Sequence, residues 1–201
     1  MQIEPGGLSR TVRIGLFGGS FDPVHLGHLL VAQAALEEIG LSRLFLIPAA
    51  RSPFKPDQAP AEAGTRLRLL RMALAGMATC EVDEQEIARG GISYTIDTVR
   101  RYAERFPGVE LHYVIGADHV AKLATWRDAK ELASLVELVV VPRPEAEMTV
   151  LPAPWRGTRL SGFPIAVSSS EIRSRISCGL PVDLLTGPVV AEAIRKNRLY
   201  L

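Results

Sequence analysis

The chain has 201 residues, 47% of them hydrophobic, which is enough for one compact core, and we interpret residues 1–201 as a single domain. Its 23 lysines and arginines nearly balance its 22 aspartates and glutamates, which disfavours a polymeric nucleic-acid partner because no broad positive field is available. No apolar run approaches the roughly 18 residues of a membrane span, and residues 1–11 lack a signal-peptide core, so we expect a cytoplasmic protein with no membrane partner and a flexible tail at 1–11.

The two cysteines indicate a reducing compartment. Cys80 and Cys178 lie far apart and have no metal-ligand spacing, so the sequence indicates neither a disulfide-stapled scaffold nor a zinc site. Free cysteine is a small side chain that is commonly buried. We therefore interpret both cysteines as small buried hydrophobic residues.

The hydrophobic pattern predicts alternating strands and helices. The run that starts at Val12 is short, β-branched at its start and closed by glycine, as in a buried strand. Apolar residues then recur at helical spacing as far as Gly40, which provides a C-terminal stop. In chain order the pattern predicts a strand at 12–18, a helix ending at 39, a strand at 44–49, an exposed loop at 55–64, helices at 67–77 and 95–106, strands at 111–116 and 135–141, a proline-rich loop at 142–164, a helix that begins near 168–170 and a last helix at 188–197.

This alternation predicts the fold class. Continuous apolar strands separated by helices are typical of an α/β, doubly wound (Rossmann-like) parallel sheet, because parallel neighbours need crossover helices. Ligands of such sheets bind at the carboxyl ends of the strands. In the helix at 67–77 and its approach, Arg66, Arg68 and Arg71 lie away from the apolar stripe, and we interpret them as a solvated face.

The segment from Gly18 to His28, GGSFDPVHLGH, joins the first predicted strand to the first predicted helix. Gly18 and Gly19 let the backbone come close to a ligand, and the N-terminus of the following helix attracts phosphate. His25 and His28 lie three residues apart at the helix entrance. Two imidazole donors there could hold an α-phosphate and stabilise the negative charge of a pentavalent transition state.

Three other interpretations of the two histidines are weaker. Zinc-hydrolase helices place their histidines four residues apart around a glutamate, whereas His25 and His28 enclose Leu26 and Gly27, which disfavours metal ligation. A capping or core role would be preferred for one isolated histidine, but less so for a pair behind a glycine-rich strand end. The segment matches neither G-x-G-x-x-G nor G-x-x-x-x-G-K-[ST], so the generic dinucleotide and P-loop fingerprints do not apply.

The same segment resembles the HxGH signature of the nucleotidyltransferase superfamily. Taken with the rest of the chain, the sequence looks like the bacterial nicotinate-nucleotide adenylyltransferase family, and the resemblance extends from Arg13 to Tyr200. It implies an enzyme of NAD biosynthesis that transfers the adenylyl group of ATP to nicotinate mononucleotide and releases pyrophosphate. It also implies catalytic roles for His25, His28 and Arg173, and ATP binding by Gly18, Gly19, Ser20, Phe21, Lys55, Asp118, Ser168 and Ser169.

Two segments match the part of the family that holds the pyridine nucleotide. SYTIDT, Ser93 to Thr98, lies where a loop enters a helix, and taken alone it is an ordinary hydroxyl cap. The resemblance puts Thr95 near the nicotinate carboxylate, which helix amides can bind without an arginine. Trp126 resembles the aromatic residue that stacks on the pyridine ring, although a core or surface tryptophan fits the sequence equally well. His112 and His119 have no such match, and we interpret them as structural.

Other segments match the nucleotide side of the family. Asp118 follows a strand end, where ligands of a parallel sheet bind. SSSEIRSRI begins with the hydroxyls of Ser168 and Ser169 and has Arg173 one turn later, a possible clamp for β- and γ-phosphate oxygens; the alternative is a serine N-cap with a surface arginine. Lys55 matches a family lysine on a loop near the phosphates, and exposed loop lysines are common.

The chain departs from the family pattern at two places. Phe54 stands where the family often has a histidine, which puts the contribution of the loop at Lys55 in doubt. Glu145 replaces the glycine that usually follows Arg143-Pro144, which puts the adenine-side contacts there in doubt.

The resemblance implies in-line attack by the acceptor phosphate on the α-phosphorus of ATP. The acceptor is already an anion at neutral pH, so no general base is needed, and Mg²⁺ would accompany ATP, held by phosphate oxygens and water. The alternatives are adenylyl transfer to nicotinamide mononucleotide or phosphopantetheine on the same scaffold, and a non-catalytic nucleotide sensor. An aminoacyl-tRNA synthetase fragment would share the histidines, but the chain lacks its lysine-rich loop and RNA-binding extension.

Overall fold

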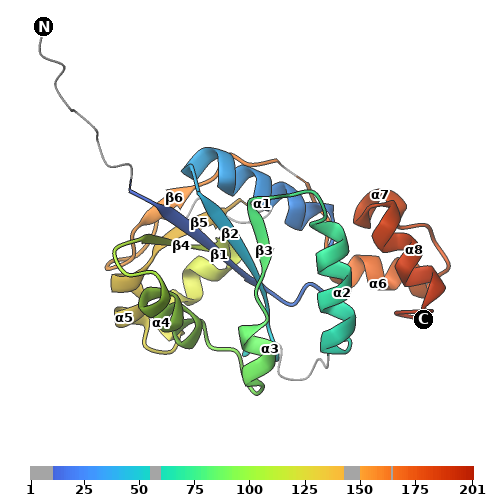
Figure 1. The fold of residues 1–201 in the computed structure, drawn as a ribbon, viewed down its shortest axis with the longest axis horizontal. Helices are drawn as coiled ribbons and strands as arrows, with labels where there is room; N and C mark the ends of the chain where they lie inside the picture. Colours follow the sequence, from blue (N-terminus) through green and yellow to red (C-terminus); the bar gives the residue numbers. More distant parts are fainter. Residues whose placement is uncertain (1–10, 55–59, 143–149, 164) are drawn as a thin grey trace, which may run out of the picture.

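A six-stranded parallel sheet forms the centre of the computed structural model, which describes residues 11–54, 60–142, 150–163 and 165–201 (Figure 1). The strand order is β3-β2-β1-β4-β5-β6, and every neighbouring pair is parallel. The doubly wound α/β fold is therefore confirmed. The strands are β1 Arg13–Gly19, β2 Arg43–Pro48, β3 Cys80–Val82, β4 Glu110–Gly116, β5 Glu137–Val141 and β6 Gly157–Arg159.

Helices cover both faces of this sheet. One hydrophobic cluster joins one face to the first, second, sixth and eighth helices, and a second cluster joins the other face to the fourth and fifth helices and a 3-10 helix. In Figure 1, α1 and the pair α4 and α5 lie on opposite sides of the sheet, and α6 to α8 lie together beyond α2. The helices are α1 Leu26–Ile39, α2 Ala63–Ala73, α3 Gln85–Arg89, α4 Thr95–Arg105, the 3-10 helix η1 Ala117–Thr125, α5 Ala129–Leu135, α6 Ser169–Ser177, α7 Asp183–Thr186 and α8 Pro188–Lys196.

The strand order reverses between β1 and β4, and this reversal positions the site. Crossovers from these two strands leave in opposite directions, so a crevice opens at their carboxyl ends, where ligands bind in doubly wound sheets. β1 and β4 pair in register through Leu16 and Tyr113. On the other side, the backbone N–H of Ala49 donates to the carbonyl oxygen of Gly19 at 2.9 Å. The ends of β1, β2 and β4 are therefore joined at one edge of the sheet.

Most predicted elements are present, with boundaries shifted by a few residues. Gly40 ends α1 in the left-handed region, with φ of 69°, as the stop signal predicted. The helix predicted at 67–77 is α2, which begins at Ala63 and ends at Ala73, with Leu74 as its C-cap residue. The prediction missed β3, α3 and α7, which have three to five residues and too little sequence to show a period.

Three expectations need correction. Arg66 is buried, with 1% of its surface exposed, whereas Arg68 and Arg71 are solvated as predicted. Cys178 is exposed and only Cys80 is buried. The loop predicted at 142–164 contains β6, which adds an edge strand beside β5 although all three of its residues are exposed.

Some expectations fall outside the described residues. These are the tail at 1–10 and the residues Lys55, Arg143 and Glu145. Within the described residues, none of the helices is both long enough and apolar enough to cross a bilayer.

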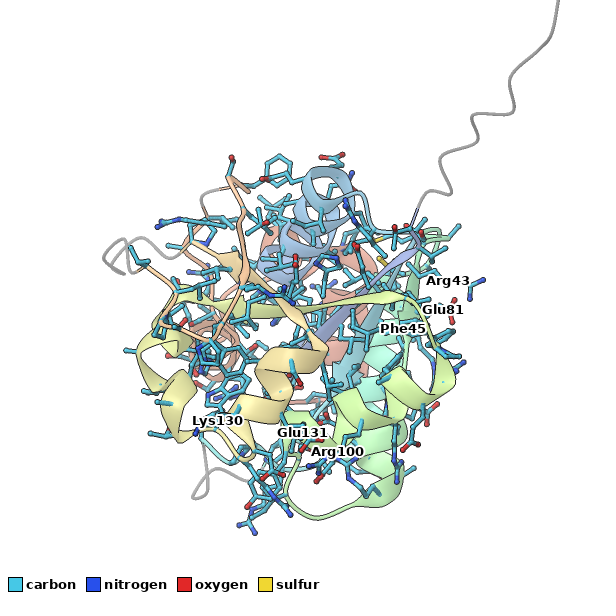
Figure 2. All side chains as sticks on the ribbon, turned by 90° about the vertical axis from the view of Figure 1, so that its left-hand side faces the viewer. Arg43, Phe45, Glu81, Arg100, Lys130 and Glu131 are labelled. Atoms are coloured by element: carbon cyan, nitrogen blue, oxygen red, sulfur yellow. The ribbon has the colours of Figure 1, made fainter. Side chains whose placement is uncertain are left out.

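An ion-pair network fastens α4 to α5. The Arg100 guanidinium donates to both carboxylate oxygens of Glu131, from Nε at 2.7 Å and from Nη2 at 2.6 Å, and also to Asp128 at 2.9 Å. Figure 2 shows Arg100 and Glu131 pointing toward one another at the surface of these two helices. Because α4 runs from Thr95 to Arg105, this contact holds the middle of a helix whose first residue reaches the crevice.

Candidate active site

The loop between β1 and α1 is shaped by close contacts at its glycines. A Cβ atom at Gly18 would overlap the hydroxyl of Tyr113, and one at Gly19 would meet the Phe21 ring at 3.0 Å. Phe21 itself has φ of 47°, which is uncommon for a bulky residue. Its buried ring packs edge-on against Phe17, with centroids 5.5 Å apart, and this packing offsets the backbone cost. The sequence of the loop therefore fixes one backbone path past the strand end.

The two histidines contact one another at the N-terminus of α1. The backbone N–H of His25 donates to Nδ1 of His28 at 3.2 Å, and the two rings stack with centroids 3.7 Å apart. Because Nδ1 of His28 accepts this hydrogen bond, a neutral His28 carries its proton on Nε2. His25 is buried and His28 lines a cavity. The capping contact predicted as one alternative is thus present, and it leaves His28 with a donor directed away from the cap.

Asp22 lies in the same loop and contacts three other segments of the chain. Its carboxylate accepts a hydrogen bond from the Tyr200 hydroxyl at 2.9 Å and one from the backbone N–H of Ala61 at 3.2 Å. Nη1 of Arg173 lies 3.9 Å from the same carboxylate and donates to the Asp22 carbonyl oxygen at 2.7 Å. Asp22 is 7% exposed, so these contacts replace most of its hydration.

Arg66 holds this loop through hydrogen bonds to backbone carbonyls. Its guanidinium donates to the carbonyl oxygens of Ser20 at 2.8 Å and Ala61 at 3.0 Å. Burial lowers the pKa of Arg66, and the nearby charge of Asp22 opposes that effect. The amphipathic pattern of α2 could not show this role, because a buried arginine and a solvated one occupy similar places in a helical period.

The start of α6 brings the serines and Arg173 to this loop. The Ser168 hydroxyl accepts from the backbone N–H of Glu171 at 3.1 Å, which is the N-cap that the sequence offered as an alternative. The Ser169 hydroxyl donates to the carbonyl oxygen of Pro23 at 2.9 Å. Arg173 Nη2 donates to the Ser170 hydroxyl of the same helix at 3.3 Å, and its Nη1 hydrogen bond to the Asp22 carbonyl makes this arginine a contact of the loop and not a freely solvated one.

A polar cavity of about 410 Å³ lies between this loop and α6. We call it the polar cavity because serine hydroxyls, an arginine and a tyrosine form much of its wall. Ser169 and Arg173 line it from α6, and Ser20 and Asp22 line it from the loop between β1 and α1. Its remaining lining residues are Ala49, Ala50, Ser52, Pro60, Ala61 and Tyr200.

A second cavity of about 270 Å³ adjoins it, and we call this one the aromatic cavity. The two share Ser20, Ala49 and Ser52, so they meet at the carboxyl ends of β1 and β2. His28 lies in the wall of the second cavity. The aromatic cavity is also lined by Phe17, Gly18, Gly19, Pro53, Phe54, Glu86, Ser93, Thr95, Tyr113, Val114, Ile115, Gly116, His119 and Trp126.

The N-terminus of α4 forms one wall of the aromatic cavity. Thr95 is the first residue of α4, and its hydroxyl lies 3.3 Å from the Tyr113 hydroxyl. Behind it, the Thr98 hydroxyl donates to a carboxylate oxygen of Glu86 at 2.5 Å. Burial raises the pKa of Glu86, whose surface is 4% exposed, and burial likewise raises the pKa of Tyr113. The uncharged form of each group is thus favoured beside the cavity.

Trp126 forms the aromatic wall together with residues of other segments. Its ring centroid lies 5.8 Å from that of Phe54, and 6.2 Å from those of both His119 and Tyr113. Its Nε1 atom is buried and has no hydrogen-bond partner among the described residues. Trp126 is half-buried with its ring at the cavity, which is the geometry that a stacking residue needs.

The remaining predicted residues lie outside this junction. Asp118 is in the first turn of η1, and its exposed side chain lies 3.7 Å from Nε2 of His119. It lines neither cavity. Lys55 is outside the described residues. Among the described residues, no group of three or more histidine, cysteine, aspartate or glutamate side chains comes together in a way that could hold a metal ion.

Several residues at the two cavities were missed by the sequence analysis. Tyr113 and Glu86 appear as a strand residue and a surface-type charge, and nothing in their spacing indicates a cavity. His119 was interpreted as structural but lines the aromatic cavity. Phe54 was noted only as a departure from the family, yet it contacts the cavity wall at Trp126. An aromatic residue in a proline-containing loop near a strand end was the available signal.

Known proteins resemble this chain in sequence and in fold. Residues 16–175 match the cytidylyltransferase-like family. The protein of Opitutus terrae named "Probable nicotinate-nucleotide adenylyltransferase" is 40% identical, covering 94% of this chain and 98% of its own, and the protein of the same name from Chromobacterium violaceum is 36% identical, covering 94% and 99%. The fold is similar to that of Plasmodium falciparum nicotinic acid mononucleotide adenylyltransferase complexed with NaAD, with a TM-score of 0.77 and 16% identity over 94% of this chain and 97% of that one.

Proposed function

Because the chain belongs to the nicotinate-nucleotide adenylyltransferase family, we propose that it transfers the adenylyl group of ATP to nicotinate mononucleotide, forming nicotinate adenine dinucleotide and pyrophosphate. The observation that supports this activity best is the junction of two unlike cavities. One has an arginine and hydroxyls for phosphates, and the other has aromatic side chains for a flat ring. His28 lines the aromatic cavity.

We assign the triphosphate of ATP to the polar cavity and the pyridine ring to the aromatic cavity. Arg173 then faces the β- and γ-phosphate oxygens, with the hydroxyls of Ser20 and Ser169 beside it. Gly18 and Gly19 leave room for the α-phosphate at the strand end. In this proposal Phe21 shapes the loop and Ser168 starts α6, and nucleotide contacts by Asp118 and Lys55 stay predictions from the family resemblance.

The reaction is an in-line displacement at the α-phosphorus. A phosphate oxygen of nicotinate mononucleotide forms the new P–O bond while the bond to the β-phosphate oxygen breaks and pyrophosphate leaves with that electron pair. The attacking phosphate is already an anion, so catalysis depends on alignment and charge stabilisation. The Nε2–H of His28 donates to the α-phosphate as its negative charge grows, and His25 orients that ring through the hydrogen bond to Nδ1.

Mg²⁺ fits this site as a companion of ATP. It prefers oxygen ligands and keeps several waters, so the phosphates and water supply most of its coordination. The hydroxyls of Ser20, Ser52 and Ser169 in the polar cavity can bind those waters, and the Asp22 carboxylate is already engaged by other donors. Bound there, Mg²⁺ would neutralise charge on the leaving pyrophosphate.

Selection of the pyridine ring depends on the aromatic cavity. A nicotinate carboxylate at Thr95 meets the positive end of the α4 dipole and its first backbone amides. Burial of Glu86 raises its pKa, which lessens its repulsion of a carboxylate nearby. Stacking on Trp126 favours a flat heterocycle over the flexible chain of phosphopantetheine. A reducing cytoplasm suits two free thiols in the described residues, and we place the reaction there.

Pyrophosphate release from ATP and Mg²⁺ tests the proposal. The purified protein is offered nicotinate mononucleotide, nicotinamide mononucleotide and phosphopantetheine in parallel. Release only with the first supports the whole assignment. Release with another acceptor would keep the histidine chemistry and overturn the assignment of the aromatic cavity, whereas tight ATP binding without release in any mixture would identify a nucleotide sensor.

A further inference from the structure

The C-terminal residues return to the candidate active site. After α8 the chain turns at Arg198 and again at Tyr200, which have φ of 50° and 65°, values that are uncommon outside glycine. The backbone N–H of Leu199 donates to the carbonyl oxygen of Ile194 at 3.1 Å and holds this turn. The turn brings the Tyr200 side chain into the wall of the polar cavity. Positive φ values outside glycine cost free energy and persist only where surrounding contacts offset that cost. The Tyr200 side chain makes one such contact.

That contact is with one oxygen of Asp22. The Tyr200 hydroxyl donates to Oδ1 at 2.9 Å, and the other oxygen, Oδ2, receives the Ala61 N–H and lies 3.9 Å from Arg173 Nη1. Arg173 directs a shorter hydrogen bond, 2.7 Å, to the Asp22 backbone carbonyl. The Tyr200 and Ala61 donors therefore satisfy both carboxylate oxygens, and the arginine stays beside the carboxylate without pairing closely with it.

We propose that Tyr200 is a positioning residue for Arg173: its hydroxyl occupies the Asp22 carboxylate, so that the guanidinium stays available to the triphosphate in the polar cavity. This inference rests on the proposed function for the location of the triphosphate. Asp22 is buried, so an oxygen that loses its donor must find another. Among the residues that the structure describes, the charged donor nearest to this carboxylate is Arg173, and a closer ion pair with Asp22 would draw the guanidinium away from a phosphate ligand.

The Tyr200→Phe variant tests this role because it removes one oxygen atom and keeps the ring. We expect the dissociation constants of ATP and of inorganic tripolyphosphate, measured by calorimetry, to rise about tenfold, which corresponds to the loss of one favourable charged contact. The KM for nicotinate mononucleotide should stay within about twofold, because the aromatic cavity does not include Tyr200.

Tyr102→Phe is the matched control. The Tyr102 hydroxyl also donates to an aspartate, Asp83, but neither residue lines the polar or the aromatic cavity. This variant loses the same kind of hydrogen bond, so it should lower the melting temperature and leave the dissociation constant of tripolyphosphate unchanged. Equal weakening by both variants would identify a general loss of stability and overturn the positioning role.

A double-variant cycle with Arg173→Lys separates positioning from direct contact. If Tyr200 acts through Arg173, adding Tyr200→Phe to Arg173→Lys should weaken tripolyphosphate binding little further. Additive losses would mean that Tyr200 acts independently, and unchanged binding by Tyr200→Phe in the wild-type background would also overturn the proposal. Tripolyphosphate binding needs no acceptor, so its result is separate from that of the acceptor assay. If Tyr200 and Arg173 are coupled in tripolyphosphate binding but no acceptor gives pyrophosphate release, the proposed function is wrong and the positioning role of Tyr200 stands.

Discussion

The two cavities lie side by side, but their walls are held in different ways. The polar cavity depends on hydrogen bonds between segments that are far apart in the sequence: Asp22 to Tyr200, Arg173 to the Asp22 carbonyl, and Ser169 to the Pro23 carbonyl. The aromatic cavity depends mainly on ring contacts of Trp126 with its neighbours, at centroid distances of 5.8 to 6.4 Å. The strength of a hydrogen bond depends steeply on its distance and angle, whereas the strength of a contact between rings depends on them much less.

This difference suits the two tasks assigned to them. Charge develops at the phosphates during the reaction, and donors stabilise it best when they are already in place. The pyridine ring does not change its charge, so the aromatic cavity needs only to bind and orient it. Small polar substitutions should therefore affect chemistry at the polar cavity, whereas changes at the aromatic cavity should affect acceptor binding and respond mainly to lost ring area.

The largest effect is expected for His28→Ala. Removing one donor to a developing oxyanion costs about 100- to 1000-fold in kcat, and we expect a loss of that size here, with the KM values changed far less. Steady-state pyrophosphate release measures it. His112→Gln is the control, because His112 is a buried β4 residue away from both cavities. Near-normal turnover of His28→Ala in a folded protein would remove His28 from the mechanism.

The next largest effect is expected for Arg173→Lys. Lysine keeps the charge but cannot bond the Asp22 carbonyl and a phosphate with one planar group. We expect kcat/KM for ATP to fall about 10- to 100-fold, since a charged hydrogen bond contributes about 1.5 to 3 kcal/mol. Arg175→Lys is a matched control on the same helix, because Arg175 is half-buried like Arg173 and its guanidinium bonds only to the Pro181 carbonyl among the described residues. An equal loss in both variants would show that the charge of α6 matters and not the position of Arg173.

The sequence predicted the part of the site that is continuous in the chain. The glycines and histidines between Gly18 and His28 share one loop, so their spacing alone brings them together. Arg173 was predicted from the family resemblance of the serine-rich segment that contains it, since the residues alone fitted an N-cap with a surface arginine equally well. Tyr200 could not be predicted from spacing, because its partner Asp22 is 178 residues away and a terminal tyrosine resembles ordinary surface sequence.

The secondary structure likewise contains elements that the sequence could predict and elements that it could not. The long strands and helices have enough residues to show a period, and their order determines a parallel sheet. β3 and β6, with three residues each, are too short to show one and join the sheet because neighbouring strands offer hydrogen-bonding edges. The burial of Arg66 escaped notice because its partners are backbone carbonyls, which leave no mark in the residue types.

Trp126 gives a sharper test of the aromatic cavity. We expect Trp126→Ala to raise the KM for nicotinate mononucleotide about tenfold, because stacking of a base on an aromatic ring contributes about 1 to 3 kcal/mol, and to leave kcat nearly unchanged. Trp126→Phe should recover most of the affinity, since it restores a ring. A large fall in kcat for Trp126→Ala at saturating acceptor would show that the ring aligns the reacting phosphate, and the contrast between the two cavities would then be wrong.

The smallest effect is expected for Glu131→Gln, which weakens the surface contact between α4 and α5 without touching either cavity. The Arg100 hydrogen bonds lower the pKa of Glu131 below its ordinary 4.5, so the stabilisation is present above that value and is lost as the pH falls through the lower folded value. Both side chains are exposed, so the fall in melting temperature at pH 7 should be small, should shrink in 1 M salt, and should disappear in acid once the pH is below the lowered pKa of Glu131. Thr95 begins the same helix, and the KM for nicotinate mononucleotide should nevertheless stay the same, because buried contacts of α4 with the sheet hold that end. A raised KM in Glu131→Gln would mean that the aromatic cavity depends on polar contacts at a distance, as the polar cavity does.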